Sequence, residues 1–141
     1  MRILALDFGE KNIGVAVSDS LGISARGLMT LRRQSIKKDL QEIFDLTQQH
    51  EAGLVVMGLP LNMDGSRGPA AEKAEEFARR LKGRLNIPVT LWDERLSTRA
   101  AERVLLEGNV RRKSRQDVID KMAAVVILQN YLDSRSNTGD S

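Results

Sequence analysis

The stretch ILALDFG, residues 3–9, joins a short apolar run to a carboxylate, Asp7, and a turn. An apolar run of this length, bounded by turn residues, predicts a buried strand that ends at Asp7. The stretch IGVAVS, residues 13–18, predicts a second strand, and the link between the two is short enough for a hairpin. Gly14, inside the second strand, indicates a bulge or the close approach of another backbone.

Outward from this hairpin, the chain alternates between further strands and helices. We expect strands at residues 25–31, 54–57 and 89–92, because these runs are apolar and lie between turn signals. Helices are expected from Ser35 to before Gly53, over 71–85, from Ser97 or Thr98 to Gly108, and from 114 to about 132. Three consecutive strands followed by this alternation imply an α/β fold, a mixed five-stranded sheet with helices on both faces. In such sheets, functional sites collect at the carboxyl ends of the central strands.

The size and composition of the chain limit what it can be. Its 141 residues predict one domain, over residues 1–133, and a small polar tail, 134–141, that we expect to be disordered. The absence of cysteine excludes disulfide bonds, thiolate metal sites and a cysteine nucleophile, and a single histidine excludes a multi-histidine zinc site. Because no apolar run is long enough to span a membrane and no signal peptide is recognisable, we expect a cytoplasmic protein without a membrane partner.

The positive charge of the chain is concentrated in one segment. The formal net charge is +3, but residues 1–94 are neutral overall, residues 95–115 carry a net +5, and residues 116–141 carry a net −2. A local excess of this kind is typical of a surface that faces phosphate groups, although a solvated helix face with a charged loop explains it equally well. The basic side chains that we expect to contact nucleic acid here are Arg95, Arg99, Arg111, Arg112 and Lys113.

Carboxylates occur at three places that a mixed sheet would bring to one edge. Asp7 ends the first strand, Asp93 and Glu94 follow the run at 89–92, and Asp120 lies among small and apolar residues of the last helix. Alternation along a strand places only one of Asp93 and Glu94 in a common site. Three converging carboxylates suit Mg²⁺ or Mn²⁺, which prefer oxygen ligands. Each carboxylate also has a structural explanation, as a turn residue, a helix cap or the partner of a nearby cation.

The loop after the run at 54–57 is rich in glycine and proline and precedes a helix. Such a loop can present backbone amides to a phosphate group at the helix N-terminus. It lacks the Gly-Lys-Ser/Thr ending of a Walker motif. Asn62, Ser66 and Arg67 are candidate substrate contacts, and a purely structural turn is the alternative interpretation.

Four segments together resemble the YqgF/RuvX family, nucleases that are similar to Holliday junction resolvases and are implicated in maturing the 5′ end of pre-16S rRNA. The matching segments are residues 5–9 with 13–19, residues 58–65, residues 93–98, and Asp120 with Ala123 and Ala124. Their order and spacing cover the chain from residue 3 to about residue 132. No segment is specific by itself, whereas the four in this order are.

The resemblance implies a ribonuclease-H-like fold and the hydrolysis of phosphodiester bonds with a divalent metal ion. It implies that Asp7, Glu94 and Asp120 are the catalytic carboxylates and hold Mg²⁺ or Mn²⁺. In related resolvases the second acid follows the fourth strand, whereas Glu94 follows the fifth predicted strand here. Asp93 and Asp64 are therefore alternative sources of the second carboxylate.

The leading interpretation is a metal-dependent nuclease that acts on structured nucleic acid, either precursor rRNA or branched DNA. An aromatic content of 4% favours recognition of shape over stacking on single-stranded bases. The rival is a non-catalytic nucleic-acid-binding factor in ribosome assembly. Residues 7–16 also resemble a phosphate loop of actin-like ATPases and sugar kinases, but those enzymes need two such domains. A monomer would suit the trimming of one RNA end, and a homodimer would suit symmetric cleavage of a junction.

Overall fold

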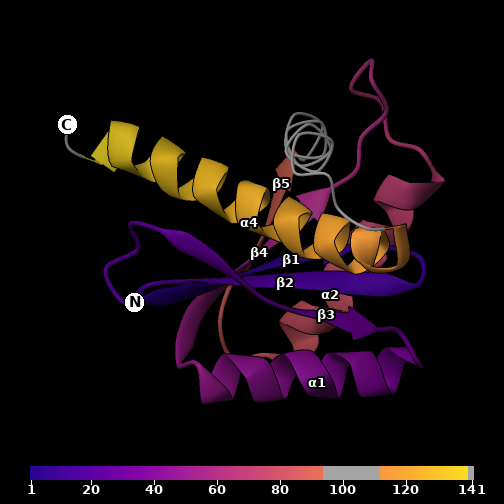
Figure 1. Cartoon of the computed structure of the whole chain (residues 1–141), viewed down its shortest axis with the longest axis horizontal. Helices are drawn as coiled ribbons and strands as arrows, with labels where there is room; N and C mark the ends of the chain where they lie inside the picture. Colours follow the sequence, from indigo (N-terminus) through magenta and orange to yellow (C-terminus); the bar gives the residue numbers. More distant parts are fainter. Residues whose placement is uncertain (94–111, 140–141) are drawn as a thin grey trace.

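The computed structural model describes residues 1–93 and 112–139, and the side chains of residues 119–135 within the second segment. A five-stranded sheet runs through it in the order β3-β2-β1-β4-β5 (Figure 1). The strands are β1 (Arg2–Phe8), β2 (Asn12–Ser18), β3 (Ala25–Arg32), β4 (Ala52–Leu59) and β5 (Val89–Asp93). Each expected strand is therefore present, within a few residues of its expected bounds.

The sheet is mixed, as the sequence predicts. β1 pairs antiparallel with β2, and β2 pairs antiparallel with β3. β4 lies on the other side of β1 and pairs parallel with both β1 and β5. The carboxyl ends of β1, β4 and β5 therefore lie at one edge, which they share with the start of β2 and the end of β3.

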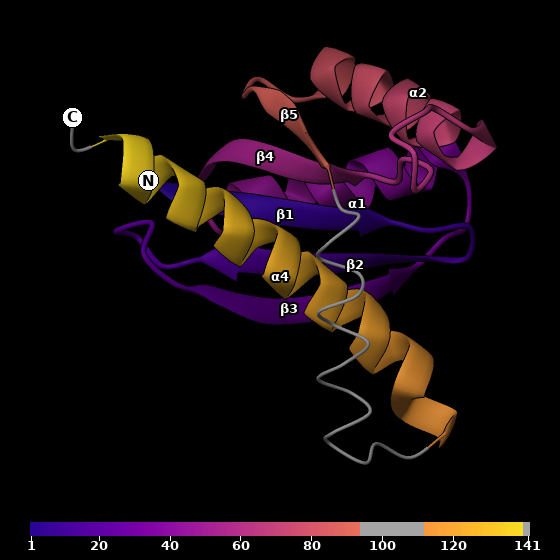
Figure 2. The same cartoon turned by 90° about the horizontal axis from the view of Figure 1, so that it is seen from above.

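Helices cover both faces of this sheet (Figures 1 and 2). Helices α1 (Ile36–Gln49) and α2 (Pro69–Arg84) lie on one face, and α4 (Arg112–Gly139) crosses the other. Two apolar cores result: one holds Leu4, Leu6 and Ile43 on the side of α1 and α2, and the other holds Ile3 and Ile127 on the side of α4. The predicted fold class is confirmed.

Local sequence explains where the first two helices begin. The Ser35 hydroxyl caps α1 by accepting a hydrogen bond from the Lys38 amide, at 3.2 Å, which satisfies one of the free N–H groups of the first turn. Pro69 begins α2, where its fixed φ suits the first helical position and no N–H is needed. The helices are held on the sheet by an apolar stripe that includes Phe77, which is 1% exposed.

The last helix differs from its expected bounds. It begins at Arg112, two residues before Ser114, and continues to Gly139, past the expected end near Leu132. The predicted boundary between a domain over 1–133 and a tail over 134–141 therefore falls within this helix. The helix expected from Ser97 or Thr98 to Gly108 lies outside the described residues. None of the helices within the described parts of the chain is both long and apolar enough to cross a membrane.

Candidate functional site

Asp7 lies near the carboxyl end of β1, on the face that α4 covers. Side chains alternate along a strand, and Asp7 follows Ile3 and Ala5, which both pack in the core beneath α4. The carboxylate is half-buried, so its partial desolvation must be offset by hydrogen bonds or by positive charge. The strand that carries Asp7 is hydrogen-bonded on both sides, by β2 and by β4, and this makes its position rigid.

Gly14 connects Asp7 to the last helix. It is the direct partner of Asp7 in the ladder between β1 and β2. A Cβ atom added at Gly14 would lie well inside 3.0 Å of the Asp120 carbonyl oxygen, a distance that real Cβ atoms essentially never show. The absence of a side chain at Gly14 therefore lets the backbone of α4 rest directly on the sheet. This is the close approach that is one of the two expectations for a glycine within this strand, and it places the backbone of Asp120 against the residue that pairs with Asp7.

Asp120 is 8% exposed and is one of the few buried polar residues among the described side chains. Its neighbours one turn further along α4 are Ala123 and Ala124, which are 2% and 0% exposed. These small residues keep the helix close to the sheet, and so they hold the carboxylate of Asp120 at the sheet surface. Buried carboxylates are rare unless they are paired or bind a cation.

Asp7 and Asp120 have the chemistry of a site for a hard divalent cation. Both offer carboxylate oxygens, and they come from two rigid elements, β1 and α4, that each contact Gly14 of β2. Within residues 1–93 and 112–139, no group of three His, Asp or Glu side chains is arranged to hold a metal ion. Glu94, the third carboxylate of the expected set, lies outside the described residues. The site can therefore be built here only from its two described members.

The two alternative acids, Asp93 and Asp64, lie in different surroundings from Asp7 and Asp120. Asp93 pairs with Leu59 at the end of β5. It shares a face of the strand with Val89 and Leu91, which pack on the side of α1 and α2, because side chains two residues apart point the same way. Asp93 therefore belongs to the opposite face of the sheet. Asp64 is exposed in the loop between β4 and α2, where its carboxylate accepts hydrogen bonds from the amide and the hydroxyl of Ser66 at 2.9 and 2.6 Å.

The other expected substrate contacts in this loop have partners within the chain. The Asn62 side-chain amide donates to the Ser66 hydroxyl at 2.9 Å, and the Asn62 amide donates to the Ser66 carbonyl at 2.9 Å. Gly65 completes this turn with a φ of +88°, a conformation that glycine adopts without strain. Arg67 forms an ion pair with Glu75 at 2.6 Å, although its side chain is 61% exposed. The loop is thus an ordered turn with an exposed rim of polar groups.

The predicted contacts in the basic segment cannot be located. Arg95, Arg99 and Arg111 lie outside the described residues, as do the side chains of Arg112 and Lys113. Their role in binding nucleic acid stays a prediction.

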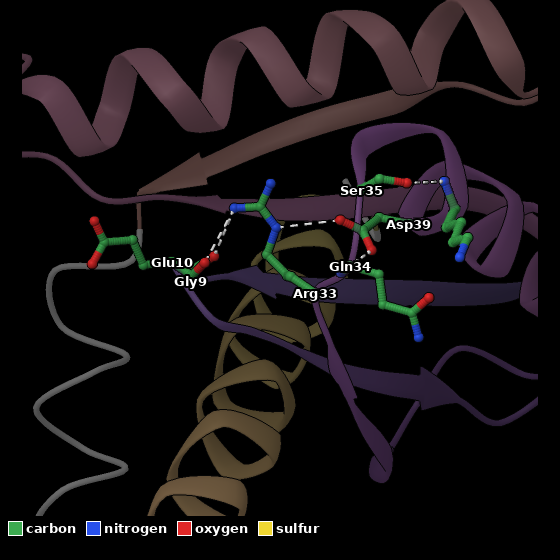
Figure 3. A network of polar contacts seen from close by, with 7 residues as sticks. Gly9, Glu10, Arg33, Gln34, Ser35 and Asp39 are labelled. Carbon is green, nitrogen blue, oxygen red and sulfur yellow. Dashed lines mark hydrogen bonds and ion pairs between the residues drawn. The ribbon is translucent and has the colours of Figure 1, made fainter.

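The structure contains a polar network around Arg33 that the sequence does not predict (Figure 3). Its guanidinium donates to the carbonyls of Gly9 and Glu10 at 3.3 and 3.4 Å, and to the buried carboxylate of Asp39 at 3.4 Å. It also lies over the ring of Phe8, 4.4 Å from the centroid. Arg33 therefore ties the turn that follows Asp7 to helix α1. No sequence motif predicts this network, because its members come from three separate elements.

Comparison with solved structures defines the fold class. Thermus thermophilus RuvC in complex with a Holliday junction substrate matches with a TM-score of 0.63 and 14% identity, over 98% of each chain. The fowlpox virus Holliday junction resolvase matches with a TM-score of 0.57 and 14% identity, over 95% of this chain and 99% of that one. At these identities the likeness shows the fold alone, which is the ribonuclease-H-like fold of the resolvases.

Sequence comparison then identifies the family. The model of the RuvX family, described as Holliday junction resolvase, matches residues 1–134, and the chain belongs to that family. A protein of Syntrophomonas wolfei named "Putative pre-16S rRNA nuclease" is 54% identical over 96% of both chains. Proteins with the same name in Thermoanaerobacter pseudethanolicus and Myxococcus xanthus are 51% and 54% identical, over 97% and 95% of this chain and 99% and 89% of theirs. The chain is therefore a nuclease, a hydrolase that acts on ester bonds of nucleic acid.

Proposed function

We propose that this nuclease processes the 5′ end of pre-16S rRNA, and that Asp7, Glu94 and Asp120 hold the Mg²⁺ or Mn²⁺ ions that it needs. The observation that supports the proposal most is the contact of Gly14 with the backbone of Asp120, because Gly14 is also the strand partner of Asp7 at the carboxyl end of β1. The substrate follows from the names of relatives that match this chain at about half of its residues or more. Such a substrate places the protein in the cytoplasm.

Each carboxylate has a defined task in this mechanism. A bound divalent ion would activate a water molecule and stabilise the leaving oxygen of the phosphodiester. Asp7, held by β1, and Asp120, held by α4, orient their oxygens before substrate arrives, so little free energy is lost to ordering them during the reaction. Because both side chains are at least half-buried, water screens the attraction between carboxylate and cation only weakly.

We choose Glu94, rather than Asp93 or Asp64, as the carboxylate that completes the site with Asp7 and Asp120. Asp93 faces the other side of the sheet, and Asp64 is bound within its own loop. β4 separates β5 from β1, so a ligand that follows β5 starts about 10 Å from β1 and has to reach inward. Glutamate has one methylene group more than aspartate, and this length favours Glu94 for that reach.

Nucleic acid would be held largely through its phosphates. We assign this role to Arg95, Arg99, Arg111, Arg112 and Lys113, with Asn62 and Arg67 on the rim of the loop after β4. Arginine and lysine contacts to phosphate give affinity without reading the sequence of bases. With few aromatic residues in the chain, recognition rests on the shape of the substrate.

The decisive experiment compares three variants on a 5′-extended 16S rRNA precursor. Asp7→Asn and Asp120→Asn keep the shape of the side chain but remove its charge, and we expect each to lower Mn²⁺-dependent cleavage by about 100-fold or more. Asp133→Asn is the control, because Asp133 is an exposed carboxylate near the other end of α4. RNA binding in EDTA should be unchanged in all three. Full cleavage by both site variants would refute the assignment, and no Mn²⁺ binding by calorimetry at millimolar ion would favour the non-catalytic assembly factor.

The fold supports a second candidate, a DNA resolvase that cuts Holliday junctions. This candidate is favoured by the fold shared with RuvC and with the fowlpox virus resolvase. Symmetric cleavage of a junction needs a two-fold homodimer, whereas the trimming of one RNA end needs only a monomer. Mapping the products from both substrates, together with the mass of the protein in solution, separates the two. Paired cuts in a junction by a dimer would overturn the RNA assignment.

A further inference from the structure

A cleft with a basic lining lies beside the proposed site, at the same edge of the sheet. It has a volume of about 440 Å³ and lies between the turn that joins β1 to β2 and the end of β3. Its lining, called the basic cleft below, consists of Glu10, Lys11, Arg32, Arg33 and Gln34. Three of these five residues are cations and one is an anion, so the cleft carries a net positive charge.

Strand register places Arg32 on the same face as Asp7, whereas Arg33 lies against Phe8 and Asp39 on the side of α1 and α2. Arg32 pairs with Asn12, just as Thr30 pairs with Gly14, and Gly14 pairs with Asp7. Directly paired residues of antiparallel strands project to the same face. Arg32 therefore stands on the face that Asp7 uses, two strands away and two residues further along, which is about 12 Å. Successive phosphates along a sugar-phosphate backbone are about 6 Å apart, so this distance corresponds to about two phosphates of one strand.

The cations of the cleft differ in how they are engaged. Arg33 is bound to two carbonyls and to Asp39, so it forms a fixed wall of the cleft (Figure 3). Lys11 and Arg32 are exposed and take part in none of the ion pairs found among the described residues. Glu10 pairs with Lys73 at 3.9 Å, with both side chains more than 60% exposed, and such a pair is weak. Lys11 and Arg32 are thus free to bind an anion.

We propose that the basic cleft binds backbone phosphates of the RNA substrate, about two nucleotides from the bond that is cleaved. The inference rests on the proposed function and adds a second phosphate-binding surface to it, on the β3 side of Asp7.

The experiment measures RNA binding in EDTA, where no metal-dependent cleavage interferes. Lys11→Gln/Arg32→Gln removes both free cations of the cleft, whereas Arg26→Gln/Lys82→Gln removes two exposed cations that lie far from it, at the start of β3 and in the last turn of α2. The two double variants have the same net charge, so a general effect of charge appears equally in both. All four positions are exposed, so both variants should fold like the wild type.

We expect the cleft variant to bind the 5′-extended precursor about tenfold more weakly at physiological salt. The slope of log affinity against log salt should become shallower by about 1.4, since each contact to single-stranded phosphate contributes about 0.7. The control variant should keep the wild-type slope. Equal slopes for the two variants would refute the proposal.

Binding and cleavage outcomes keep this proposal separate from the proposed function. If Asp7→Asn still cleaves RNA but the cleft variant has a shallower slope of log affinity against log salt than the wild type, the catalytic assignment fails and the basic cleft stands. If the cleft variant has a shallower salt slope than the wild type on branched DNA but not on the RNA precursor, the assignment of the cleft to RNA is overturned.

Discussion

Replacing Gly14 by alanine tests the idea that contact between α4 and the sheet builds the site. The new methyl group would collide with the carbonyl of Asp120 and would come within 3.1 Å of the Lys121 amide nitrogen. To reach ordinary contact at 3.4 Å, α4 must move away from the sheet by about 1.5 Å. The colliding atoms belong to backbone on both sides, so no side chain can rotate to relieve the strain. We expect a loss of about 3 kcal/mol, at the upper end for overpacked cores.

This loss has two measurable consequences. For a domain of this size, 3 kcal/mol lowers the Tm by about 10 °C, which thermal unfolding followed by circular dichroism detects. A displacement of Asp120 by more than 1 Å from Asp7 should also lower cleavage by about 100-fold at temperatures where the variant is folded. Mn²⁺ binding by calorimetry should weaken in parallel, because both carboxylates belong to the proposed metal site.

Gly83→Ala provides the control for this experiment. Gly83 lies in α2, and an added Cβ there meets nothing within 4 Å. Because alanine is the better helix former, this variant should be about 0.5–1 kcal/mol more stable than the wild type, with unchanged cleavage. If Gly14→Ala has the Tm and the activity of the control, the contact between the sheet and α4 does not position Asp120, and the reasoning fails.

Three further predictions concern the supporting structure. Ser35→Ala removes the cap of α1 and should lower the free energy of unfolding by about 1 kcal/mol, measured by urea titration, with no change in RNA affinity. Asp39→Ala leaves the Arg33 guanidinium and a backbone amide without their acceptor and should cost about 2 kcal/mol; a double-mutant cycle with Arg33→Ala that shows no coupling would contradict the network. The Ile23 amide, which donates to the Asp19 carboxylate, lowers the pKa of Asp19 below its ordinary value of 3.8. Its contribution to stability is therefore full above pH 3.8 and is lost as the pH falls through the lowered pKa, and NMR titration of the carboxyl carbon should give a value below that of Asp19 in a short peptide.

Much of the fold can be predicted from local sequence. Apolar runs bounded by turns identify all five strands, and Ser35 marks the start of α1, because these signals depend on neighbouring residues only. The end of α4 is predicted less well: polar residues after Leu132 suggest a tail, but the helix continues to Gly139. Composition alone cannot mark such an end, because polar residues are compatible with a helix that leaves the core.

The candidate site can be predicted only in part. Asp7 is recognisable as a carboxylate at the end of a buried strand, and Gly14 is recognisable as a point of close approach, though its partner is not. The exclusion of Asp93 depends on which face of β5 meets α1 and α2, which is known only when the sheet is assembled. The Arg33 network has no sequence signal, because its members meet through tertiary packing.

Residue type and short-range periodicity are enough to predict the order of the described strands and helices, the position of Asp7 at a strand end, and the absence of thiolate and multi-histidine chemistry. The tertiary structure brings the backbone of Asp120 against Gly14, the strand partner of Asp7, because α4 crosses β2 at a residue without a side chain. It also decided that Lys11 and Arg32 form one basic cleft, although the first 94 residues carry no net charge. Strand register brings together charges that are far apart in the chain, and register is a property of the whole sheet.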